Sequence, residues 1–281
     1  MYISIQELCQ NLKDLLQIKF NHLLPIHDFE YILKSEKVQF LVNNIKSEAQ
    51  LNEKLIHLAN AYMAGKPVQY IINEAVFMDL ILFVDERVLI PRSETEELVH
   101  WIELDNKHEN ISKNVLDIGT GSGCIPIYLK RKFQNWTILG LDISKEALDV
   151  AKMNANKYET EIFWMHGDFL HENLNVLDKL DIIVSNPPYI PMSESFLMGS
   201  NVINYEPQSA LFVDDEQPYL FYEKIISFSK DQMHKNGKIY CEMNEFRAIE
   251  INKLFIDAGF TTEIKEDLQG KSRMLKAWFS N

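Results

Sequence analysis

The chain has 281 residues, of which 46% are hydrophobic and 25% are charged. This composition excludes a disordered or fibrous chain and leaves enough apolar material for a large core. The formal net charge of −13 at pH 7 would repel phosphate backbones, so we expect no stable binding to nucleic acid.

The three cysteines are widely spaced and form no CxxC pair, which excludes a disulfide scaffold. No histidine or cysteine spacing is typical of a metal site, so we expect no metal. The chain contains no run of about 18 apolar residues, and its first residues lack the basic start and apolar stretch of a signal peptide. We therefore expect a cytoplasmic protein with no membrane span.

Residues 1–66 are predicted to form an N-terminal helical bundle, because apolar residues recur there at helical spacing. The bundle would be either a structural cap or a module that docks a substrate protein. Residues 67–91 change character. Apolar runs at 68–72 and 80–84 predict a β-hairpin that links two domains.

Residues 92–281 are predicted to form the second domain. Ser93 and Glu96 have the spacing of a capping box, which predicts a helix to about Leu104. Strands then alternate with helices, and this alternation predicts an α/β fold with a parallel sheet wrapped by helices. The predicted strands are 115–118, 136–141, 162–165, 180–185 and 238–242, with two more within 260–279, seven in all.

A glycine-rich turn follows the first of these strands. It comprises Asp117, Ile118, Gly119, Thr120, Gly121, Ser122 and Gly123. Glycines at alternate positions let a backbone adopt positive φ and approach a ligand closely, and the turn precedes a helix N-terminus with unpaired N–H groups. Cys124 stands where a dinucleotide motif would have its third glycine, and the turn lacks the Lys-Ser/Thr of a P-loop. The loop therefore favours a nucleotide-like ligand without a pyrophosphate.

Acidic residues after neighbouring strands refine this interpretation. Asp142 ends the second strand, where a carboxylate can accept both hydroxyls of a ribose. Asp117 could face a ligand ammonium, Asp168 could bind an adenine amino group, and Phe169 could stack on that ring. A ribose plus a cation fits S-adenosylmethionine better than a nicotinamide dinucleotide. Two alternatives remain: Asp142 is a helix cap, or Asp168 is only a turn residue.

The most specific motif is Asn186-Pro187-Pro188-Tyr189, at the end of a predicted buried strand, where open α/β sheets bind their ligands. The prolines remove two backbone donors and stiffen the turn. Acceptors remain on the Asn186 side chain and the Pro187 carbonyl, and together they suit an NH2 group. Tyr189 offers a flat face to a planar group. A delocalised nitrogen is a poor nucleophile, and fixed acceptors on its hydrogens would stabilise the charge that it gains during alkylation.

With these motifs, the chain resembles the bacterial protein-glutamine methyltransferases that modify class-I peptide chain release factors. The resemblance covers nearly the whole chain. The matching segments are GKPVQYI (65–71), VLIPRSETEELV (88–99), VLDIGTGSGC (115–124), LDISKEAL (141–148), GDFL (167–170), IIVSNPPYIP (182–191) and YEPQSALF (205–212). It implies a Rossmann-like, seven-stranded S-adenosylmethionine-dependent methyltransferase domain behind the small helical domain.

The resemblance implies methylation of the side-chain amide of the glutamine in the release factor's Gly-Gly-Gln loop, with S-adenosyl-L-homocysteine as the product. The implied cofactor contacts are Asp117, Gly119 to Gly123, Asp142, Ile143, Asp168, Phe169 and Asn186. Catalysis is assigned to Asn186, Pro187 and Tyr189. Substrate binding is assigned to the NPPY residues with Arg92 and Glu94, although these last two could equally be surface residues of a helix start. We expect a monomer, and Glu206 is either an anchor for the loop after NPPY or a turn residue.

The sequence departs from the family pattern at four places. Ser93 stands where the family usually has proline, and Phe169 where some members have tryptophan. The segments 213–218 and 243–247 lack the glycine and glutamine residues that many members carry. These two segments bear on the shape of the substrate loop rather than on the chemistry.

Three other functions remain open at this point. Methylation of an adenine or another exocyclic amine of a nucleic acid also uses an NPPY motif, but it would call for a basic face. Glutamine methylation of a ribosomal protein is a closer alternative, against which the PRSETE segment favours release factors. A non-catalytic cofactor-binding protein would need a damaged loop or motif, and both are intact.

Overall fold

The computed structural model describes residues 35, 48–108, 111–172 and 178–280. The chain divides into two compact units, Met1–Glu74 with Gly199–Tyr205, and Ala75–Met198 with Glu206–Asn281. Most of the predicted helical bundle lies outside the described residues. Nothing in the described part of the chain forms a helix long and apolar enough to cross a membrane.

The first unit contains the helices α4 (Glu48–Met63), α5 (Val68–Ile72) and α9 (Ser200–Tyr205). The helix α5 corrects the prediction of a strand at 68–72. Pro67 precedes the helix with φ −53°, and Asn73 ends it in the left-handed conformation with φ 57°. Proline is well tolerated at a helix start and asparagine at a helix end, and a short apolar run between them fits either structure.

A hairpin is present, but its first strand is not the predicted run at 68–72. It pairs β1 (Ala75–Phe77) antiparallel with β2 (Leu80–Leu82), which lies within the predicted second strand. Asn154 of the helix α8 (Lys145–Lys157) and Tyr158, the residue that follows this helix, hold the hairpin. Asn154 Oδ1 accepts a hydrogen bond from the Phe83 N–H at 2.7 Å, and the Tyr158 hydroxyl oxygen accepts one from the Ile81 N–H at 2.6 Å. The hairpin is therefore a fixed part of the second unit.

The seven-stranded sheet is confirmed, with the order β10-β11-β9-β6-β3-β4-β5. The five strands from β9 to β5 in this order are parallel, while β11 is antiparallel to both β9 and β10. Their bounds are β3 (Asn114–Ile118), β4 (Thr137–Asp142), β5 (Phe163–His166), β6 (Leu180–Ser185), β9 (Met233–Glu242), β10 (Phe260–Glu266) and β11 (Ser272–Phe279).

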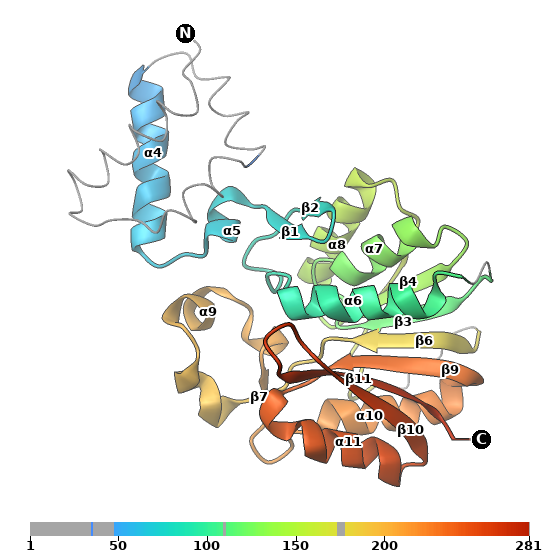
Figure 1. Cartoon of the computed structure of the whole chain (residues 1–281). Helices are drawn as coiled ribbons and strands as arrows, with labels where there is room; N and C mark the ends of the chain where they lie inside the picture. Colours follow the sequence, from blue (N-terminus) through green and yellow to red (C-terminus); the bar gives the residue numbers. More distant parts are fainter. Residues whose placement is uncertain (1–34, 36–47, 109–110, 173–177, 281) are drawn as a thin grey trace. The chain divides into compact units, whose positions relative to one another are not determined.

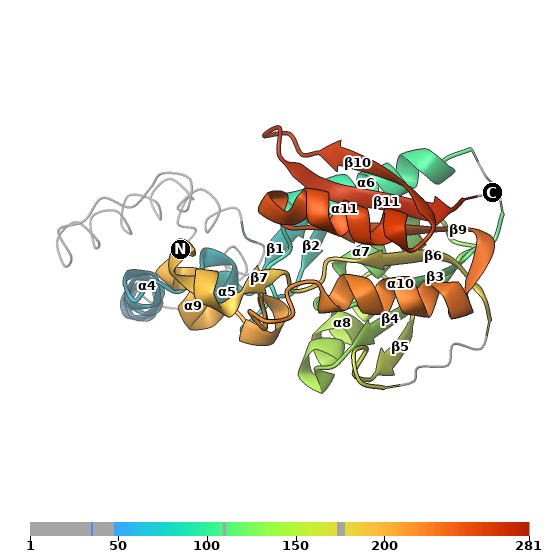
Figure 2. The same cartoon turned by 90° about the horizontal axis from the view of Figure 1, so that it is seen from below.

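Helices cover both faces of this sheet (Figures 1 and 2). One face carries α6 (Ser93–Asn106), α7 (Cys124–Lys132) and α8, and the other carries α10 (Leu220–Gln232) and α11 (Ala248–Asp257). Successive residues of a strand face opposite sides, and Val115 and Leu116 of β3 accordingly belong to two different core clusters. The short elements are β7 (Ile190–Pro191), β8 (Phe212–Val213) and the 3₁₀ turns η1 (Met192–Leu197), η2 (Gln208–Ala210) and η3 (Glu245–Arg247).

Two helices of this unit begin differently. At α8, Ser144 is the N-cap, and its Oγ accepts from the Ala147 N–H at 3.0 Å. The predicted capping box of Ser93 and Glu96 is wrong. Helix α6 begins at Ser93 without a side-chain cap, because Glu96 Oε1 instead accepts a hydrogen bond from the Met78 N–H in the hairpin.

Candidate active site

A cavity of about 350 Å³ opens at the carboxyl ends of β3, β4 and β6, where ligands of open α/β sheets bind. Seven of the predicted cofactor contacts line it: Gly119, Gly121, Asp142, Ile143, Asp168, Phe169 and Asn186. Asp117, Thr120, Ser122 and Gly123 do not line it. Lining residues that the sequence did not single out include Arg87, Leu89, Pro207, Phe212 and Phe221.

The glycine-rich loop forms one wall of the cavity. The N–H groups of Gly119 and Thr120 both donate to the Leu141 carbonyl at 2.9 Å, which ties the loop to the end of β4. Gly119 and Gly121 have positive φ angles of 76° and 54°, and a Cβ on either would meet no atom within 4 Å. Both residues line the cavity and have no side chain, so a ligand can lie directly against the backbone of the loop.

Asp142, at the end of β4, holds the glycine-rich loop through hydrogen bonds. Its two carboxylate oxygens accept from the Gly121 N–H at 2.8 Å and the Ser144 N–H at 2.9 Å. Each oxygen keeps a further lone pair, so the carboxylate can still accept the two hydroxyls of a ribose. Burial raises the pKa of Asp142, although these backbone N–H groups oppose the shift.

Asp117 lies beneath the same loop, with only 1% of its surface exposed. Neither of its carboxylate oxygens has a hydrogen-bond partner among the described residues. Its pKa is raised to about 7, chiefly by burial; Thr120 opposes the shift and the nearby charge of Asp142 adds to it. A buried acid without a partner is costly unless a cation binds nearby, so this group fits a positively charged ligand.

Asp168 and Phe169 follow β5. Asp168 Oδ1 accepts from the Leu170 N–H at 2.9 Å, and Oδ2 lies 2.8 Å from His171 Nδ1. Burial tends to raise the pKa of Asp168, but these hydrogen bonds outweigh it and lower the pKa. Phe169 is 5% exposed and packs edge-on against Phe228. Its place in the wall of the cavity leaves its ring available to a flat ligand group.

The NPPY residues follow β6. Asn186 donates through Nδ2 to the Thr95 hydroxyl at 3.0 Å, and no described residue donates to its Oδ1 or to the Pro187 carbonyl. The Tyr189 hydroxyl donates to Glu242 Oε1 at 3.0 Å, and burial raises the pKa of that phenol well above its usual value. The two oxygens that the chemistry needs are therefore not consumed by the described part of the protein.

Arg92 and Glu206 together hold the loop beyond the motif. Glu206 is 4% exposed and accepts from Arg92 Nη2 at 2.7 Å and from the Ile90 N–H at 3.1 Å. These bonds favour the role of Glu206 as an anchor over that of a turn residue. Glu94 accepts a hydrogen bond from the Ser93 hydroxyl at 2.9 Å, at the start of α6.

Sequence reasoning missed Thr95 and Glu242 as parts of this site. Thr95 donates to Glu242 Oε2 at 2.7 Å, and the two residues are separated by 147 positions. The only available signal was that each lies near a segment noted for other reasons. Among the described residues, no group of histidine, cysteine, aspartate or glutamate could hold a metal.

Comparisons with known proteins agree with this geometry. Residues 98–205 match the family model of the methyltransferase small domain. The release factor glutamine methyltransferase of Flavobacterium psychrophilum is 42% identical, over 76% of this chain and 76% of its own. The protein of that name from Leptospira interrogans is 38% identical, over 87% of this chain and 86% of its own.

The structure of a human methyltransferase 10 domain containing protein superposes with a TM-score of 0.51 at 20% identity, over 70% of this chain and 88% of the other. This likeness concerns the fold alone.

Proposed function

This chain belongs to the family of release factor glutamine methyltransferases, and from that premise we propose that it methylates the side-chain amide of the glutamine in the Gly-Gly-Gln loop of class-I peptide chain release factors. The observation that carries the proposal is the pair of acceptors at the NPPY motif. Asn186 lines a cavity suited to a nucleoside cation, Pro187 is the next residue in the chain, and described residues leave Asn186 Oδ1 and the Pro187 carbonyl without a donor.

S-adenosylmethionine would supply a methyl group bound to a positively charged sulfur. The backbone of Gly119 and Gly121 would lie against this donor, and the Asp142 carboxylate would accept hydrogen bonds from its ribose hydroxyls. Phe169 would lie against the adenine. The buried charge of Asp117 would favour the donor's cationic end over a neutral or anionic ligand.

In this reaction the residues of the chain would orient the substrate's amide nitrogen for attack on the methyl group and stabilise the charge that it gains. Asn186 Oδ1 and the Pro187 carbonyl would accept the two amide hydrogens and hold the nitrogen in line with the methyl carbon. The bound donor would supply its methyl group to this nitrogen, so that a nitrogen–carbon bond would replace the carbon–sulfur bond and the donor would be left as a neutral thioether. The nitrogen gains positive charge as it attacks, and the fixed acceptors stabilise that charge until a proton departs to solvent.

The remaining parts of the proposal concern partners and location. We propose that residues 1–66 dock the release factor and that the NPPY motif of the second unit receives its loop. We also propose that the enzyme acts as a cytoplasmic monomer. The net charge of −13 supports a protein substrate rather than a nucleic acid.

The test is mass spectrometry after incubation of the purified chain with a labelled methyl donor. The substrates are a class-I release factor, the same factor with its loop glutamine replaced by glutamate, a ribosomal protein fraction and adenine-containing oligonucleotides. We expect one added methyl on the loop glutamine and none on the other three. A methyl on adenine or on a ribosomal protein, with none on the release factor, would contradict the proposal.

A further inference from the structure

Three hydrogen bonds link Asn186 to Tyr189 through side chains of two other elements. Asn186 Nδ2 donates to Thr95 Oγ1 at 3.0 Å, and Thr95 donates to Glu242 Oε2 at 2.7 Å. The other oxygen of Glu242, Oε1, accepts from the Tyr189 hydroxyl at 3.0 Å. Thr95 is 3% exposed in the first turn of α6, and Glu242 is 1% exposed at the end of β9.

The direction of this chain of bonds is set by the chemistry of its members. An ionised carboxylate only accepts, so Thr95 and Tyr189 both give their hydroxyl protons to Glu242. A hydroxyl has a single proton, so Thr95 can offer only a lone pair to Asn186. Asn186 must then turn its NH2 group to Thr95, and its oxygen lies on the other side of the amide.

This direction decides whether Asn186 suits its substrate. An asparagine turned the other way would present two N–H donors to the NH2 group of a glutamine, which is also a donor. Such a contact is repulsive and would leave the attacking nitrogen unsupported. Because the two amide orientations have nearly the same shape, packing alone separates them poorly, and hydrogen bonds must choose between them.

We infer that Thr95 and Glu242 are positioning residues of the methyl transfer, which fix the Asn186 amide with its oxygen free for the substrate nitrogen. The inference rests on the proposed function. Neither residue lines the cavity, so both act through Asn186 rather than on the reacting atoms.

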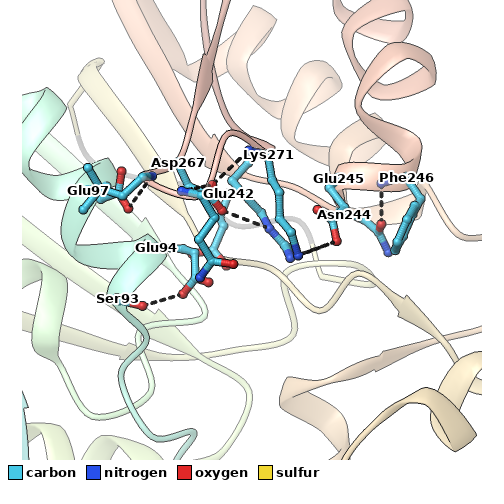
Figure 3. A network of polar contacts seen from close by, with 12 residues as sticks. Ser93, Glu94, Glu97, Glu242, Asn244, Glu245, Phe246, Asp267 and Lys271 are labelled. Atoms are coloured by element: carbon cyan, nitrogen blue, oxygen red, sulfur yellow. Dashed lines mark hydrogen bonds and ion pairs between the residues drawn. The ribbon is translucent and has the colours of Figure 1, made fainter.

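The surroundings hold Glu242 firmly in this role. Its backbone carbonyl accepts from the Tyr222 hydroxyl at 3.0 Å. Charged side chains from α6, from the end of β9 and from the β10–β11 turn gather around it (Figure 3). Burial and, to a smaller extent, the nearby charge of Glu94 raise the pKa of Glu242, whereas the hydroxyls of Thr95 and Tyr189 and the positive charge of Arg273 oppose the shift.

The kinetic test compares three variants. Thr95→Val keeps the side-chain shape but removes the hydroxyl, Thr95→Ser keeps the hydroxyl, and Ser93→Ala removes an exposed hydroxyl two positions away on the same helix. We expect Thr95→Val to lower the single-turnover rate on the release factor by about 10- to 100-fold, as the loss of a supporting contact in an active site does. Its Kd for S-adenosylhomocysteine should stay within about twofold of wild type, because the cofactor wall is untouched. Thr95→Ser should recover most of the rate, and Ser93→Ala should match wild type.

A second measurement needs no substrate. In ¹⁵N NMR spectra, the side-chain NH2 of Asn186 should show a hydrogen bond and slow exchange in wild type and Thr95→Ser, and lose both in Thr95→Val. Glu242→Gln offers an independent variant, because its new amide can donate to Thr95 and free the threonine proton for Asn186. We expect it to produce a second set of Asn186 signals.

These measurements separate two failures. Unchanged Asn186 signals in both Thr95→Val and Glu242→Gln would overturn the inference, as would a wild-type rate in Thr95→Val. A wild-type chain that transfers no methyl to the release factor would refute the proposed function, while the NMR comparison would still decide the orientation of Asn186.

Discussion

Replacing Asp117 with asparagine should make the free protein more stable and its cofactor binding weaker. The buried carboxylate has no hydrogen-bond partner among the described residues, and burial raises its pKa to about 7. Asparagine has nearly the same shape without the charge. The substitution therefore removes a cost to folding together with the group that we propose attracts the cationic donor.

The size of the effect follows from proton linkage. The folded pKa lies about 3 units above the ordinary value of 3.8, and at about 1.4 kcal/mol per unit the ionised group costs about 4 kcal/mol. Between these two pKa values the folded protein holds a proton that the unfolded chain has lost. The unfolding free energy of wild type therefore falls as pH rises towards about 7 and then levels off. About 3 kcal/mol of this loss should fall between pH 5 and pH 8.

The assay is urea unfolding of wild type and Asp117→Asn at pH 5 and pH 8, with calorimetric binding of S-adenosylmethionine at pH 8. The variant should gain stability relative to wild type as pH rises, and bind the ligand at least about tenfold more weakly. Asp168→Asn is the matched control from the same cavity, because the pKa of Asp168 is lowered and replacing its carboxylate should not stabilise the protein at pH 8. A stability difference between wild type and Asp117→Asn that does not change with pH would refute the reasoning.

Four further predictions follow from the site. Asn186→Ala should abolish methyl transfer to the release factor and leave the calorimetric Kd for S-adenosylhomocysteine within a few-fold; full activity would remove its proposed role. Asp142→Ala should instead weaken that Kd strongly, since the ribose acceptor and two loop contacts are lost together. Glu206→Ala should lower the unfolding free energy by about 1–3 kcal/mol, because it leaves the Ile90 N–H and Arg92 without their partner, whereas Glu216→Ala at an exposed position should not. Deletion of residues 1–64 should raise KM for the release factor more than it changes the cofactor Kd, and an unchanged KM would make those residues only structural.

The sheet could be predicted because its signals are local. Each parallel strand is a short apolar run that ends in a turn residue or a glycine, and the structure has strands at all of these places. The strand predicted at Val68–Ile72 is wrong for the same reason, because a short apolar run fits a strand or a helix equally well. Only Pro67 and Asn73 at its ends favour the helix. Glu96 was misassigned because its partner, the Met78 N–H, comes from a hairpin whose position the sequence does not specify.

The same limit explains which site residues were found. Asp142 ends a strand and Asn186 directly follows one, so their place at the edge of the sheet follows from topology. Thr95 and Glu242 lie 147 positions apart, and their contact depends on how α6 packs on the end of β9. No pattern within either segment encodes that distance, so the support for Asn186 appears only in three dimensions.

The distribution of unsatisfied groups ties the two halves of the site together. Of the seven buried side-chain atoms without a partner in the described part of the chain, four belong to Asp117, Thr120 and Ser122 in and beneath the glycine-rich loop. Folded proteins rarely leave such atoms unpaired, and Asp117, the charged residue among them, would gain most from a cation bound against the loop. The free oxygens of Asn186 and Pro187 add acceptors at the same edge of the sheet. A site that combines an unpaired buried acid with two unpaired acceptors favours a cationic donor beside an NH2 group. It disfavours an anionic cofactor beside a carbonyl substrate, because the carboxylate and the two acceptors would then face groups of their own sign.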